Sequence, residues 1–158
     1  MNTYTINQIK KTISTMEASD IAAICLRMAK YKKENKELLS YLLYESIDEA
    51  NYIEQVQAEI DEMFDLLIDN GSYKYMKQIR KIARFISKPM KYSGQASTQI
   101  EILLYFTTKL KLILKKKSSL TALQNLYLQQ LKKIDTTMTK LHEDIQYDYV
   151  KSIEGLRL

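Results

Sequence analysis

The sequence is poor in the residues that break or bend regular structure. It has three glycines, one proline and no tryptophan in 158 residues. So few turn-forming residues exclude a β-sandwich or a β-barrel, because such folds need many tight turns. Leu, Ile, Lys, Glu, Gln and Ala dominate the long segments between the glycines, and these residues favour helices. The composition therefore predicts an all-α protein that is long enough to bury a core of its own.

Residues that form metal sites or reactive centres are equally scarce. A single cysteine, Cys25, excludes an intramolecular disulfide and a cysteine-based zinc site, and a single histidine, His142, excludes a histidine cluster. The three glycines are too widely separated to form a phosphate-binding loop. We expect Cys25 to be an inert thiol in the core and His142 to be exposed to solvent.

Long apolar segments are also missing. The longest uninterrupted apolar runs, such as IAAIC and ILLYF, are too short to span a bilayer, and the N-terminal residues contain no apolar leader segment. With one cysteine and no such segment, the sequence predicts a cytoplasmic protein without a membrane partner.

The charges are distributed unevenly along the chain. The net charge is +5, yet residues 45–70 carry nine acids and no cation, whereas residues 71–134 carry fourteen cations and one acid, Glu101. Adjacent blocks of opposite sign indicate either a charged partner or pairing between neighbouring helices.

Apolar residues recur at helical spacing over most of the chain. The pattern predicts six or seven helices that form hairpins, stacked as a short α-solenoid or packed as an irregular bundle. Pro89 is expected to end one helix, and residues 91–98 are expected to be a loop in which Ser97 or Thr98 caps the next helix. The predicted helices cover residues 5–15, 20–31, 36–46, 48–69, 72–88, 99–114 and 119–154.

The last predicted helix has a heptad pattern of apolar residues, at positions 127, 131, 134, 138, 141 and 145. Unbroken, it would be roughly 50 Å long, which exceeds the width of a compact domain of this size. We therefore expect a helical-hairpin domain at 1–118 and a C-terminal helix at 119–158 that either packs across it or forms a homodimer. A break near residues 135–137 is the alternative.

The segment ICLRMAKYKKENKELLSYLL, residues 24–43, resembles a group of small bacterial helical proteins that share a turn similar to Ala-Lys-Tyr-Lys-Lys-Glu-Asn. This resemblance covers little of the rest of the chain and implies no activity.

The acidic block contains an E-x-x-D-E motif followed by an E-x-x-D motif, formed by Glu45, Asp48, Glu49, Glu62 and Asp65. This arrangement resembles the paired acidic motifs of the MazG and dimeric dUTPase nucleotide pyrophosphohydrolases, which implies a magnesium cofactor bound by these carboxylates. One straight helix would hold Glu45 and Glu62 roughly 25 Å apart, however, so the same acids also suit a solvated helix face.

The basic block is concentrated on one side of a predicted helix. At 100° per residue, Lys74, Lys77, Lys81, Arg84 and Lys88 fall within a stripe about 80° wide, opposite the apolar residues. Such a stripe suits contacts with the phosphates of a nucleic acid, although a solvated face or an acidic protein partner would produce it as well. The candidate nucleic-acid-binding residues are Lys77, Lys81, Arg84, Lys88, Lys91, Lys115, Lys116 and Lys117.

The favoured interpretation of the sequence is a non-enzymatic helical interaction protein that binds nucleic acid through its basic residues. The alternative is a magnesium-dependent hydrolase that uses the acidic block.

Overall fold

The computed structural model describes residues 3–157, which are mainly helical and contain no β-strand. The all-α fold predicted from composition is confirmed, with more helices than the six or seven expected. The chain divides between Tyr44 and Glu45 into two compact units. This boundary does not coincide with the division expected at residue 118, and residues 119–157 belong to the second unit.

The first unit contains three short helices and the start of a π-helical turn. They are α1 (Ile6–Ile13), α2 (Ala18–Tyr31), α3 (Lys33–Ser40) and the π-helix η1 (Tyr41–Glu45), whose last residue belongs to the second unit. Thr5 and Gln8 form a capping box that starts α1. No side chain of α1, α2 or α3 is buried, and Cys25 is only half-buried, so the expectation of a core thiol is wrong.

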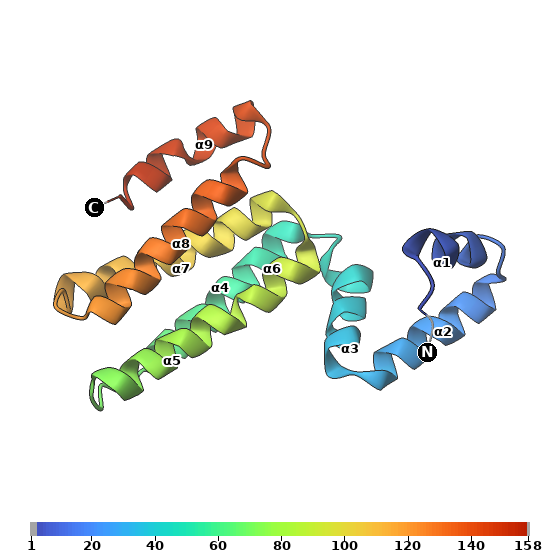
Figure 1. Cartoon of the computed structure of the whole chain (residues 1–158), viewed down its shortest axis with the longest axis horizontal. Helices are drawn as coiled ribbons and strands as arrows, with labels where there is room; N and C mark the ends of the chain where they lie inside the picture. The colour runs from blue at the N-terminus through green and yellow to red at the C-terminus, as the bar shows by residue number, and fades with distance from the viewer. Residues whose placement is uncertain (1–2, 158) are drawn as a thin grey trace. The chain divides into compact units, whose positions relative to one another are not determined.

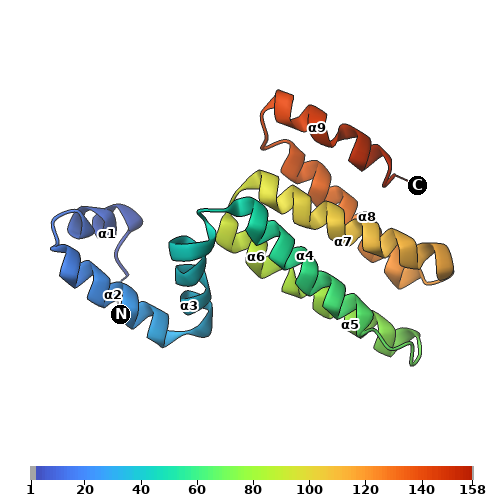
Figure 2. The ribbon, with the colours of Figure 1, turned by 180° about the vertical axis from the view of Figure 1, so that it is seen from behind.

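The second unit is built from two antiparallel hairpins and a final helix (Figures 1 and 2). In the first hairpin, α4 runs against α5 and α6, and in the second, α7 runs against α8. Helix α9 then folds back beside α8 (Figure 1). Their bounds are α4 (Glu49–Asp65), α5 (Ser72–Phe85), α6 (Ser87–Ser93), α7 (Ala96–Lys116), α8 (Thr121–Met138) and α9 (Glu143–Glu154).

Helix α7 forms the centre of this unit, because it contacts α4, α6 and α8. Apolar side chains cover most of its circumference, and Ile100, Phe106 and Leu110 are fully buried. The Phe106 ring meets Phe64 of α4 at a centroid distance of 5.9 Å, in a tilted arrangement that aromatic pairs favour. A helix with so wide an apolar face needs several neighbours, and α4, α6 and α8 supply them.

The region around Pro89 differs from the prediction. Helix α5 ends at Phe85, and Pro89 lies within the first turn of α6, where its missing N–H group needs no helical partner. The loop expected over 91–98 is reduced to Gly94 and Gln95, and Gly94 takes the left-handed conformation (φ +66°) that ends α6. Thr98 does not cap α7 but is buried within it, so the predicted cap is wrong.

The prediction of a single helix over 119–154 is also wrong, because α8 ends at Met138 and α9 begins at Glu143. The hydroxyls of Thr136 and Thr137 donate to backbone carbonyls four residues earlier, each at 2.8 Å, and side-chain bonds of this kind weaken or bend the end of a helix. His142 is exposed, as expected, and caps α9 by accepting a hydrogen bond from the Asp144 N–H at 3.4 Å.

The heptad seam of α8 packs inside the chain. Tyr127 and Ile134 are both 0% exposed. These two seam positions are therefore not available to a second chain, and the homodimer stays a prediction. None of the described helices is both long enough and apolar enough to cross a bilayer.

Several polar contacts attach the C-terminal segment to α7 and α8. The Lys111 ammonium group of α7 donates to the Gly155 carbonyl at 2.9 Å, which satisfies a carbonyl at the end of α9. The Tyr127 hydroxyl donates to the Leu156 carbonyl. Burial and a hydrogen bond to Glu101 of α7 raise the pKa of Tyr149 to about 12.

We expect Phe106→Ala to lower the free energy of unfolding by about 3–5 kcal/mol, because it empties a buried site at the centre of the second unit. Urea denaturation followed by circular dichroism measures this loss. The matched control is Leu112→Ala on the same helix, where the side chain is 53% exposed and the change should be within about 0.5 kcal/mol. Equal losses in the two variants would show that α7 is not the centre of the core.

Candidate nucleic-acid interface

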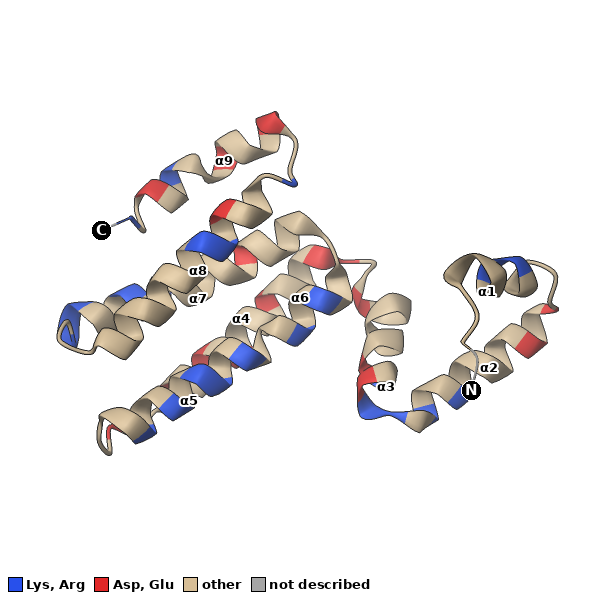
Figure 3. Ribbon diagram, viewed as in Figure 1, with Lys and Arg blue, Asp and Glu red and all other residues tan. Residues whose placement is uncertain are grey.

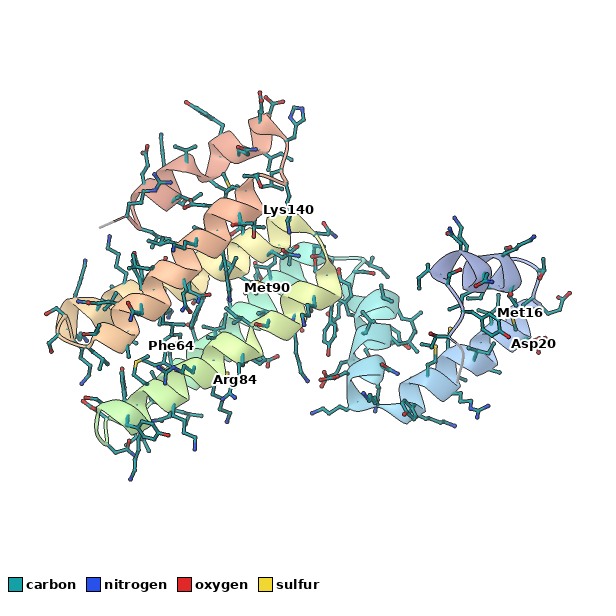
Figure 4. All side chains as sticks on the ribbon, viewed as in Figure 1. Met16, Asp20, Phe64, Arg84, Met90 and Lys140 are labelled. Carbon is teal, nitrogen blue, oxygen red and sulfur yellow. The ribbon has the colours of Figure 1, made fainter. Side chains whose placement is uncertain are left out.

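A groove separates α5 and α6 from α8 on one face of the second unit. Two hollows form it, of about 390 and 550 Å³, and they share Ser87 and Lys133 in their linings. The hollows therefore adjoin one another. Figure 3 shows Lys and Arg positions along α5, α6 and α8 on the face turned to the viewer, and Figure 4 labels Arg84 and Met90, which line different hollows.

The side chains that line the groove are basic or neutral. No acid is among them, and all six cations are exposed to solvent. Neutral polar side chains, including Gln99, Gln129 and Gln130, make up much of the remaining lining. The six cations are Lys77, Arg80, Arg84, Lys91, Lys132 and Lys133.

The spacing of the lining residues explains how α5, α6 and α8 line one groove. On α5 and α6 the lining positions 73, 77, 80, 84, 87 and 91 alternate steps of four and three. On α8, positions 126, 130, 133 and 137 follow the same steps. Residues spaced in this way lie on one face of a helix, so each helix presents a continuous stripe to the groove.

Two acids of the second unit pair with lysines outside the groove. Asp61 of α4 pairs with Lys109 of α7 at 2.6 Å, and Asp69 pairs with Lys117 at 2.5 Å. Over residues 3–157, no ion pair within 4.0 Å links an acid to any of the six groove cations. Asp61 and Asp69 of the acidic block are therefore engaged with lysines along α7 and at its end, not with the groove cations.

The pairing at Asp61 involves a third residue. The Tyr105 hydroxyl donates to Asp61 Oδ2 at 2.6 Å, and the Lys109 ammonium group lies 5.2 Å from the centroid of the Tyr105 ring. The hydrogen bonds from Lys109 and then Tyr105 lower the pKa of Asp61, and the bond to Asp61 raises the pKa values of Tyr105 and Lys109. These contacts hold α4 and α7 together.

The predicted basic residues fall into separate places. Lys77, Arg84 and Lys91 line the groove, whereas Lys81 and Lys88 are exposed beside it. The lysines of 115–117 lie at the far end of α7, where they line two other hollows. Lys117 is held there by Asp69 and lies 5.1 Å from the centroid of the Tyr75 ring.

Three groove cations were missing from the candidate set, namely Arg80, Lys132 and Lys133. Arg80 follows Lys77 by three residues and precedes Arg84 by four, so the three-and-four spacing contained a signal for it. Nothing in the sequence placed α8 beside α5, because the order of helices in space depends on their packing.

The predicted metal ligands are not brought together. Glu49 and Glu62 lie on the unbroken helix α4, about 20 Å apart along its axis. Asp48 caps α4 through the Asn51 N–H at 3.0 Å, and Glu49 accepts hydrogen bonds from the hydroxyls of Ser93 at 3.1 Å and Thr98 at 2.5 Å. Across the described part of the chain, no group of three or more His, Cys, Asp or Glu side chains has the geometry to hold a metal ion.

Searches against protein-family models, curated proteins and solved structures found no match to this chain.

We expect Asp61→Asn to lower the free energy of unfolding by no more than about 1 kcal/mol at neutral pH, because Asp61 and Lys109 are both partly exposed. The folded protein lowers the pKa of Asp61, so its carboxylate stabilises the fold fully above about pH 4 and loses this effect as the pH falls through the lower folded value. Urea titrations from neutral to acidic pH should show the two proteins converging at low pH. Asp65→Asn, at an exposed acid on the same helix, should change little, and an equal effect there would contradict the assignment.

Proposed function

We propose that the second unit binds single-stranded nucleic acid in the groove between α5–α6 and α8. The observation that supports this most strongly is the set of six exposed groove cations that have no acidic partner within the described residues. Cations that the chain itself leaves unneutralised are available to the phosphates of a ligand.

The shape of the site favours a strand over a duplex. Helical proteins that read duplex DNA insert a convex helix into its major groove. Here the cations line hollows between two helices, and each hollow is large enough for a nucleotide-sized group. Single-strand binders use a basic groove of this kind to follow the backbone.

The side chains that line the groove predict that binding affinity depends only weakly on the base sequence of the strand. Lysine and arginine contacts to phosphate position a strand without reading its bases, and counterion release makes such binding sensitive to salt. Aromatic stacking would be limited to Tyr73 at one end of the groove, because it is the one aromatic side chain in the lining.

We expect the triple variant Arg80→Glu, Arg84→Glu, Lys133→Glu to bind a short labelled oligonucleotide at least tenfold more weakly than wild type at about 50 mM salt. The slope of log affinity against log salt should fall by roughly 2, since about 0.7 is lost for each phosphate contact removed. Fluorescence anisotropy across a salt series measures both quantities.

The matched control is Lys10→Glu, Lys11→Glu, Lys140→Glu, which changes the net charge equally at three exposed sites outside the groove. It should retain most of the wild-type affinity. An equal loss of affinity in both triple variants would show that binding depends on overall charge and not on the groove. Absence of binding by wild type at low salt would refute the proposal, and tighter binding of polyglutamate than of the oligonucleotide would indicate an acidic protein as the partner.

A further inference from the structure

The groove contains a buried polar group that phosphate contacts do not explain. Gln130 lies in the middle of the α8 stripe and is 1% exposed. Its Oε1 atom is buried without a hydrogen-bond partner. A buried acceptor without a donor is energetically costly, and native proteins contain few of them.

The orientation of the Gln130 amide follows from its other contact. Its Nε2 group donates to the Leu126 carbonyl at 3.3 Å. Exchanging the oxygen and nitrogen atoms would place two acceptors next to each other. The unsatisfied group is therefore an acceptor, and a ligand that satisfies it must supply a hydrogen-bond donor.

An ionised phosphate oxygen has no proton to donate. The phosphates of a strand held by the lysines and arginines therefore cannot donate a hydrogen bond to Gln130 Oε1. In RNA, every nucleotide carries a 2′-hydroxyl close to the phosphate, and this group donates a hydrogen bond whatever the base is. DNA lacks this donor. Because Gln130 lines the same hollow as Arg80, Arg84 and Lys133, a backbone held by these cations has its sugars near the amide.

We propose that the groove binds RNA in preference to DNA, with Gln130 accepting a hydrogen bond from a ribose 2′-hydroxyl. This inference rests on the proposed nucleic-acid binding and adds that the preferred strand is RNA. Because Oε1 is covered in the free protein, the proposal requires side chains at the surface of the groove to change rotamer as the strand binds, and such changes are common at interfaces.

The first experiment varies the ligand and leaves the full-length protein unchanged. Anisotropy titrations compare short oligouridine, oligodeoxyuridine and 2′-fluoro oligouridine of equal length. The three strands share their base and their charge, and the 2′-fluoro strand keeps an RNA-like sugar without the donor. We expect wild type to bind oligouridine about fivefold more tightly than either of the other two strands, the value of one hydrogen bond.

The second experiment removes the acceptor. Gln130→Leu should bind oligouridine only as tightly as it binds oligodeoxyuridine, so that the preference for RNA is lost. The neighbouring Gln129 is exposed and also lines the groove, so Gln129→Leu is the matched control and should keep the preference for RNA. If Gln130→Leu does not fold, as circular dichroism would show, the ligand series alone decides the inference.

The outcomes separate this inference from the proposed function. Equal, salt-sensitive binding of all three strands by wild type would overturn the preference for RNA and leave nucleic-acid binding in place. A preference that persists in Gln130→Leu would overturn the role of Gln130. Failure of wild type to bind any of the strands at low salt would instead overturn the proposed function itself.

Discussion

The burial of helix α7 is the constraint on which the rest of the second unit depends. Its buried residues cover about two thirds of the circumference, so it needs several other helices to pack against it. Contacts with α4, α6 and α8 meet this requirement. The helices that cover α7 also determine which charged side chains meet it.

One result of this arrangement is the way in which opposite charges pair. Helix α4 lies against α7, and its acid Asp61 meets Lys109 of that helix, while Asp69 just beyond α4 meets Lys117. Each pair contributes little stability at an exposed position. Their larger effect is on the distribution of charge, because acids engaged with α7 do not neutralise the cations of α5.

The groove holds these cations in a concave surface. Cations of α5, α6 and α8 surround a concave region, where charges of one sign reinforce one another and attract a polyanion. Gln130 adds a neutral acceptor below them. Under the proposed function, charge would govern how tightly a strand is held and the acceptor would select the kind of strand, since long-range attraction and short-range hydrogen bonding have different requirements.

The sequence by itself determined the all-α class, the approximate extent of most helices, the exposure of His142 and the basic stripe on α5, because these depend on composition and on spacing within one helix. It offered a break near residues 135–137 only as the alternative to one long helix, because the apolar pattern continues past Met138, where α8 ends. Only the tertiary structure decided that α8 faces α5 and that Lys133 and Gln130 join Arg80. The reason is physical: the choice of helix neighbours depends on how side chains fill the space around α7, and no spacing along the chain encodes that choice directly.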